Sequence, residues 1–199
     1  MEEGSHRGQS LVSKFQVFPE GHSALKLPLL AFITKACLAV RGKLNIRLGK
    51  NKDATIKDFL RALSERPSST LILLIDSDGP DDGFLRGNLM KSALWRKHAP
   101  RKLSTPAVHW MVRVMERWFI ADQAALKAYY KKKFNPKALP KARDVETVSK
   151  PHVYKSLKLA SGGKYDKPSH APKILERLDP RTVRIRASNC DRFLSFICT

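Results

Sequence analysis

The feature that most constrains the fold is an aliphatic run at residues 71–75, which ends at two acidic residues. The run reads Leu-Ile-Leu-Leu-Ile, and an unbroken apolar segment of this length is typical of a strand buried on both faces of a parallel sheet. Asp76 and Asp78 follow it one residue apart, and Gly79-Pro80 ends the strand. Because open α/β sheets bind ligands at the carboxyl ends of their strands, we predict a central strand whose end presents two carboxylates.

Strand and helix patterns alternate along the first part of the chain. Residues 14–18 and 43–49 alternate between apolar and polar side chains, as strands do, whereas residues 25–40 form an apolar run typical of a largely buried helix. A second helix is predicted around residues 56–63, with Asp53 or Thr55 as its cap and Pro67 at its end. This alternation predicts an α/β fold with a parallel sheet.

The pattern continues after the central strand. A fourth strand is predicted at residues 108–116, with Glu116 at its carboxyl end. The charged stretch between them, residues 81–106, is predicted to be a long functional loop in which Trp95 could stack on a base. The remaining predicted helices are residues 117–121 and 123–130, with Asp122 as a cap between them, and the shorter segments 151–160, 171–178 and 189–197.

Charge separates the two ends of the chain. The sequence has a formal net charge of +20, and residues 126–199 contain 18 basic and 6 acidic residues. Such a balance favours polyanionic partners, above all nucleic acid, although a merely solvated basic surface is the alternative. We therefore divide the chain into a flexible N-terminus at 1–13, a catalytic domain at 14–130 and a basic helical C-terminal extension at 131–199.

Cysteine usage and hydropathy bear on the environment of the chain. Cys37, Cys190 and Cys198 are odd in number and follow no CxxC spacing, which argues against a zinc site or a disulfide framework. No apolar segment is long enough to span a bilayer, and the N-terminus lacks the apolar core of a signal peptide. The expected location is therefore the cytoplasm, without a membrane partner.

Four carboxylates follow predicted strands. Glu20, Asp76, Asp78 and Glu116 should meet at one edge, because the carboxyl ends of parallel strands lie together. Such a cluster would hold Mg²⁺ or Mn²⁺, which stabilises the attacking and leaving oxygens in phosphodiester chemistry. Purely structural roles are the alternative: the aspartates could form a polar turn, and Glu20 and Glu116 could each lie at the start of a helix.

Two of these motifs resemble a known fold. Glu20-Gly21 and Asp76-Ser77-Asp78 resemble the two signature motifs of the Toprim fold, which primases, topoisomerases and OLD-type nucleases share. More closely, HWMVRVMERWFIADQAAL (109–126), GGKYDKPSHAPKILERLDPRTVR (162–184) and ASNCDRF (187–193) resemble a bacterial Toprim-like family of unknown function, sometimes labelled RloG-like.

The resemblance implies a Rossmann-like, four-stranded parallel sheet with flanking helices. It also implies that Glu20 is a general acid/base or metal-associated carboxylate, that Asp76 and Asp78 are metal ligands, and that Glu116 is an accessory metal-site residue. Relatives often occur beside ATPases in anti-phage defence loci, which implies an AAA- or ABC-type ATPase partner.

The leading interpretation is a Mg²⁺-dependent Toprim nuclease that cleaves DNA or RNA, tRNA included, as the effector of a bacterial anti-phage defence system. A non-catalytic nucleic-acid-binding or regulatory subunit that works with an ATPase is the alternative, and the sequence leaves a homodimer open. A topoisomerase or primase comes third, because the chain is short for the further domains of those enzymes. The candidate phosphate contacts are Lys164, Lys167, His170, Lys173, Arg96 and Lys97.

Overall fold

The computed structural model describes residues 14–65, 68–77, 82–98, 108–111 and 114–199, and its centre is a four-stranded parallel sheet. The strands are β1 (Phe15–Pro19), β2 (Leu44–Ile46), β3 (Thr70–Asp76) and β4 (Val108–Met111), in the spatial order β2-β1-β3-β4. The α/β class and the all-parallel sheet are thus confirmed. The N-terminus predicted to be flexible, residues 1–13, lies outside the described residues.

Strand β3 lies inside the sheet, as its sequence predicts. It pairs with β1 in a register that places Val17 opposite Ile72, and with β4 in a register that places Ile75 opposite Trp110. All five aliphatic side chains of residues 71–75 are buried. Because helices cover both faces of the sheet, successive side chains of β3 are removed from water on either side.

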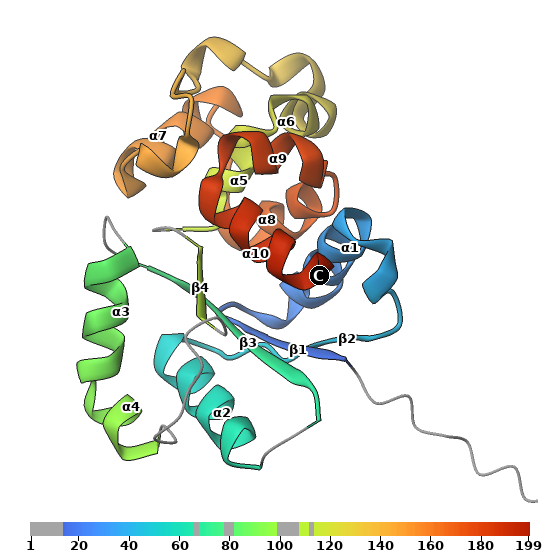
Figure 1. Cartoon of the computed structure of the whole chain (residues 1–199). Helices are drawn as coiled ribbons and strands as arrows, with labels where there is room; N and C mark the ends of the chain where they lie inside the picture. The colour runs from blue at the N-terminus through green and yellow to red at the C-terminus, as the bar shows by residue number, and fades with distance from the viewer. Residues whose placement is uncertain (1–13, 66–67, 78–81, 99–107, 112–113) are drawn as a thin grey trace, which may run out of the picture.

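The helices form two layers, one on each face of the sheet (Figure 1). One layer contains α2 (Lys52–Ser64), α3 (Asp82–Lys91) and α4 (Ala93–His98). The other contains α1 (Lys26–Ala36), α5 (Glu116–Ala121), α6 (Gln123–Tyr130), α7 (Lys150–Ala160), α8 (Lys167–Leu175), α9 (Pro180–Arg186) and α10 (Ser188–Cys198). Short 3₁₀ segments lie at η1 (Ser23–Leu25), η2 (Leu38–Val40), η4 (Lys131–Lys133), η5 (Pro136–Ala138) and η6 (Val145–Thr147).

The larger of the two hydrophobic cores joins the sheet to the C-terminal helices. It contains Val17 and Ile72 from the sheet, Phe32 from α1, and Ile174 and Phe193 from α8 and α10. Residues 131–199 therefore share one core with the first helix and the sheet. Figure 1 shows these helices gathered above the sheet, on the side opposite α2.

The first helix is shorter than predicted. Instead of running over 25–40, α1 ends at Ala36, because Cys37 takes an extended backbone conformation with φ −142° and ψ 96° before η2 begins. The helix is also buried on one face only: Phe32 and Ile33 lie in the core, whereas Leu27 is 72% exposed.

The prediction of a long loop at residues 81–106 is wrong for the part that the structure describes. Residues 82–98 contain the helices α3 and α4. Trp95 is 6% exposed and its ring stacks on that of Phe59, with 6.4 Å between centroids. Leu89 is buried in the same core. The many charged residues of this segment made its helical pattern hard to recognise in the sequence. Leu89 and Trp95 share a core with residues of α2, so Trp95 is a core residue and not a platform for bases.

The prediction of a strand reaching Glu116 is also wrong. Strand β4 ends at Met111, and Glu116 is the first residue of α5. The Asp122 cap is confirmed, since its carboxylate accepts a hydrogen bond from the Ala125 N–H at 3.0 Å. Further along, α8 begins four residues earlier than predicted, and α9 was not predicted although Asp179 caps it.

The cap of α2 is Asn51, not Asp53 or Thr55, and this leads to a prediction. The Asn51 side chain accepts a hydrogen bond from the Ala54 N–H at 2.9 Å. Asn51→Ala should lower the free energy of unfolding by about 1 kcal/mol, because one N–H at the helix start loses its partner. Asp53→Ala, at an exposed first-turn position, is the control and should change it by less than about 0.5 kcal/mol. Urea unfolding measures both, and equal losses would contradict the assignment.

Within the described residues, no helix is both long enough and apolar enough to cross a membrane.

Candidate functional site

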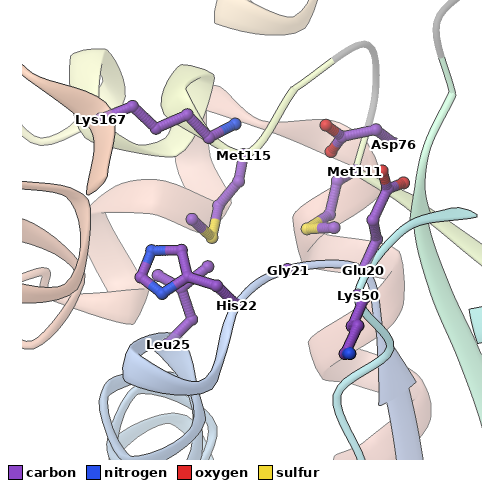
Figure 2. Close-up of a pocket in the computed structure, with 9 residues that line it drawn as sticks. All are labelled: Glu20, Gly21, His22, Leu25, Lys50, Asp76, Met111, Met115 and Lys167. Atoms are coloured by element: carbon purple, nitrogen blue, oxygen red, sulfur yellow. The ribbon is translucent and has the colours of Figure 1, made fainter.

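A pocket of about 250 Å³ opens where β1 and β3 end. Figure 2 shows the carboxyl groups of Glu20 and Asp76 on one wall, with the Lys167 side chain reaching toward them from the other. The full lining consists of Glu20, Gly21, His22, Leu25, Lys50, Asp76, Met111, Met115 and Lys167. Two acidic and two lysine side chains thus share a pocket whose remaining walls are largely apolar.

Glu20 is held in place by backbone hydrogen bonds to two neighbouring segments. Its N–H donates to the carbonyl of Leu74 at 3.1 Å, and the next N–H, of Gly21, donates to the carbonyl of Gly49 at 3.1 Å. Glu20 and Gly49 also form a parallel bridge just beyond β1 and β2. The turn after β1 is therefore fixed against both adjacent strands, and Glu20 is presented at the carboxyl edge of the sheet.

This turn depends on a glycine that touches the next helix, which leads to a second prediction. A Cβ at Gly49 would lie 2.7 Å from Cα and 2.8 Å from N of Thr55, and both atoms are backbone. Gly49→Ala should therefore lower the free energy of unfolding by about 1–3 kcal/mol, because α2 must shift. Gly87→Ala is the matched control. A Cβ there meets nothing within 4 Å, so replacing this helical glycine should instead stabilise the protein, by roughly 0.5–1 kcal/mol. Two similar losses in chemical denaturation would contradict the prediction.

Asp76 ends β3 beside Glu20, and its environment disfavours a negative charge. Its Oδ1 atom is buried and has no hydrogen-bond partner among the described residues. The pKa of Asp76 is raised to about 7, chiefly by burial and also by the carboxylates of Glu20 and Glu116, against the lowering effect of the Lys167 and Lys150 charges. A cation bound at this oxygen would offset the repulsion between the carboxylates and would give Oδ1 a partner.

Glu116 lies behind the pocket in an ion pair. Its side chain is fully buried, and its carboxylate lies 3.0 Å from the Lys167 ammonium group. The Tyr165 hydroxyl donates a hydrogen bond to Oε1 at 3.1 Å, and Lys167 also donates to the Tyr154 hydroxyl at 3.3 Å. Burial lowers the pKa of Lys167, but Glu116, Tyr154 and Asp76 together raise it by more, so the lysine stays charged.

The structure brings together only some of the predicted site residues. Glu20 and Asp76 line the pocket and Glu116 lies next to it, whereas Asp78 lies outside the described residues. Among the predicted phosphate contacts, Lys167 lines the pocket. Arg96 and Lys97 are exposed on α4, away from the pocket lining, and Lys164, His170 and Lys173 belong to a separate surface beside α8.

Two polar lining residues were missed by the sequence analysis. Lys50 lies four residues beyond β2 but directly follows the strand predicted at 43–49, so the rule that located Glu20 and Asp76 at strand ends would also have found it. His22 lies two residues beyond Glu20 in the same turn. The pairing of Lys167 with Glu116 joins residues 51 positions apart, and no local pattern in the sequence signals it.

The residues present fit a divalent metal with few protein ligands. Within the described part of the chain, no group of three or more His, Cys, Asp or Glu side chains is arranged to hold a metal ion. Glu20 and Asp76 nevertheless supply two carboxylates, and Oδ1 of Asp76 is a buried oxygen that lacks a hydrogen-bond partner among the described residues. Mg²⁺ is commonly held by one or two carboxylates, with waters and substrate phosphates completing its coordination.

Comparison with known proteins identifies a family. No curated protein and no solved structure matches the chain. One family model matches residues 28–197, a stretch that begins after Glu20 and contains Asp76, Glu116 and Lys167. Because this match covers most of the sequence, the chain belongs to the family described as a domain of unknown function, DUF4276.

Proposed function

We propose that the protein is a Mg²⁺- or Mn²⁺-dependent nuclease of the Toprim type, which hydrolyses phosphodiester bonds in DNA or RNA at the Glu20–Asp76 pocket. The observation that carries the proposal is the Oδ1 atom of Asp76, which is buried, has no hydrogen-bond partner among the described residues, and lies in the same pocket as Glu20. A buried carboxylate oxygen left in this state is costly, and a hard cation offsets that cost.

Each pocket residue has a role in this proposal. Glu20 and Asp76 would hold the metal, which when bound polarises the phosphate and lowers the pKa of a bound water. Lys167 and Lys50 place ammonium groups in the pocket, where they would contact the oxygens of a phosphodiester. Met111 and Met115 exclude water from one wall, so these charges act through a medium less polar than water.

The wider setting of the proposal comes from the Toprim resemblance. It favours an effector of bacterial antiviral defence that acts in the cytoplasm with an ATPase partner. The net charge of +20 supports a polyanionic substrate, because neutralising backbone phosphates releases their counterions.

A second candidate is a nucleic-acid-binding or regulatory subunit without catalytic activity. It is favoured by the absence, among the described residues, of any group of three side chains arranged to hold a metal. In that case the pocket lysines would bind a phosphate that is never cleaved.

Cleavage of labelled single-stranded DNA, duplex DNA and bulk tRNA distinguishes the two candidates. We expect the wild-type chain to cut at least one substrate with Mg²⁺ or Mn²⁺ and none with EDTA. Glu20→Gln should reduce cleavage to the EDTA level while binding persists, whereas Glu65→Gln, at an exposed position, should cut like wild type. If a folded wild-type chain binds nucleic acid but cuts none of the substrates with either metal, the binding subunit is favoured instead.

A further inference from the structure

A cluster of lysines lies around the loop between α7 and α8, outside the pocket: Lys158 is on α7, Lys164 on the loop and Lys173 on α8. Gly162 and Gly163 turn this loop with φ values of 64° and 83°. The Ser161 hydroxyl oxygen fixes it by accepting hydrogen bonds from the N–H groups of Lys164 at 3.0 Å and Tyr165 at 2.7 Å. These hydrogen bonds fix the backbone of the loop at Lys164, whose side chain is exposed.

The same loop packs against η4, which contributes Lys133. A Cβ at Gly162 would lie 3.6 Å from the carbonyl oxygen of Lys133, and the Asn135 N–H donates to the carbonyl of Ala160 at 2.8 Å. The Lys133 side chain contacts that of Lys164 and lowers its pKa. Two ammonium groups in contact repel each other, and an anion between them would remove the repulsion.

His170, on α8, lies among the lysines of this cluster. Burial lowers its pKa, and the ammonium groups of Lys173, Lys158 and Lys164 lower it further, against the opposing effect of the Asp166 carboxylate. That carboxylate already accepts a hydrogen bond from the Ser169 N–H at 3.1 Å, at the start of α8. Three lysines therefore act on His170, Lys133 lies next to one of them, Lys164, and the Asp166 carboxylate among them is already hydrogen-bonded.

The His170 ring is held in one orientation. Its Nδ1 accepts a hydrogen bond from the Asp166 N–H at 3.4 Å and lies 3.1 Å from the Tyr130 hydroxyl. Because Nδ1 accepts from a backbone donor, the neutral ring carries its proton on Nε2. Nε2 is then a hydrogen-bond donor, which suits a phosphate oxygen.

We propose that Lys133, Lys158, Lys164 and Lys173, with His170, form a second phosphate site that holds the nucleic-acid backbone at a fixed distance from the pocket. Helix α7 sets this distance. Its first residue, Lys150, acts electrostatically on Asp76, and Tyr154 contacts the pocket residue Lys167. Lys158 lies eight residues beyond Lys150, which corresponds to about 12 Å along a helix.

This spacing defines a substrate class. Successive phosphates of one strand of a duplex are separated by no less than their axial rise of about 3.4 Å, so about 12 Å spans at most roughly three or four nucleotides. The substrate is therefore a polynucleotide that continues for several nucleotides, roughly up to four, between the bond in the pocket and the second site. Phosphate binding at the second site does not depend on whether the protein cleaves nucleic acid. The length requirement for cleavage, by contrast, rests on the nuclease activity proposed above.

Binding to duplex DNA in EDTA, measured across a range of salt concentrations, tests the second site without any cleavage. The double variant Lys133→Gln/Lys164→Gln should make the slope of log K against log salt shallower by about 2, because two phosphate contacts are lost. Lys57→Gln/Lys91→Gln removes the same charge from exposed positions on α2 and α3 and is the control, with a slope close to that of wild type. Equal slopes for the two double variants, or no binding by the wild type, would overturn the proposal.

Cleavage of a length series then tests the spacing. We expect wild type to cut oligonucleotides with at least six nucleotides on each side of the bond faster than those with two, and Lys133→Gln/Lys164→Gln to lose this preference. Cleavage that is independent of length would overturn the spacing. If no oligonucleotide is cut while the salt slopes differ as expected, the nuclease proposal fails and the phosphate site stands.

Discussion

Asp76→Asn is expected to stabilise the metal-free protein at pH 8 and to have much less effect at pH 4. Burial raises the pKa of Asp76 to about 7 in the folded chain, against about 3.8 for an unperturbed aspartate. Folding therefore takes up a proton between these pH values, and stability is lost as the pH rises through the folded pKa. Relative to the variant, wild type should lose on the order of 3 kcal/mol between pH 4 and pH 8.

Thermal unfolding in EDTA measures this difference. At this chain length, about 3 kcal/mol corresponds to a melting temperature roughly 6–12 °C higher for Asp76→Asn than for wild type at pH 8. Asp53→Asn, which replaces an exposed aspartate on α2, is the control and should follow wild type. Parallel pH curves for wild type and Asp76→Asn would show that the carboxyl group is not desolvated.

Lys167→Met is expected to destabilise the protein by about 2–3 kcal/mol at pH 7, because it leaves the buried Glu116 carboxylate without its cation. The full cost of breaking a buried ion pair is larger, but the Lys167 side chain is 42% exposed, so water reaches the site and lowers the penalty. Urea unfolding measures the loss. Lys155→Met, an exposed position on α7, is the control and should change stability by less than about 0.5 kcal/mol.

A second substitution separates the charge from the packing. Glu116→Gln removes the charge that Lys167 neutralises but keeps an acceptor for the Tyr165 hydroxyl. Combined with Lys167→Met, it should recover at least half of the lost stability, because position 116 then carries no buried charge that needs a cation. If the double variant is as unstable as Lys167→Met alone, the loss arises from packing and not from the ion pair.

The sheet was predictable because the sequence patterns of its strands differ from those of the helices. The aliphatic run at 71–75 is too short and too uniformly apolar for a surface helix, and its alternation with helical segments indicates parallel pairing. Helix ends were less predictable. Asn51, Asp53 and Thr55 are all plausible caps, and only the backbone conformation selects Asn51.

Long-range packing accounts for the errors. The stretch at 82–98 has a charged composition that favours a loop, yet Leu89 and Trp95 find an apolar surface on α2 and the segment becomes helical. Glu116 follows an alternating pattern that continues past the real end of β4, so its position at the start of α5 was considered only as an alternative. In both cases tertiary contacts override the local pattern.

The acidic wall of the pocket could be predicted from the sequence, whereas the place of Lys167 in the pocket could not. Glu20 and Asp76 come from strand ends, and the topology of a parallel sheet alone brings them together. Lys167 arrives from the C-terminal helices through their packing on α1 and the sheet, so its partner and its place in the pocket required the structure. The basic charge of residues 126–199 indicated a phosphate-binding surface but did not place one of its lysines beside Asp76.

Titration of the wild-type chain with Mn²⁺, followed by the paramagnetic resonance signal of the free ion, tests most directly whether the Glu20–Asp76 pocket is a metal site. We expect wild type to remove Mn²⁺ from solution and Asp76→Asn to remove markedly less, whereas Asp53→Asn should match wild type. Excess Mg²⁺ should displace the bound ion. Binding by Asp76→Asn that equals that of wild type would contradict the account, because the metal would then be held elsewhere.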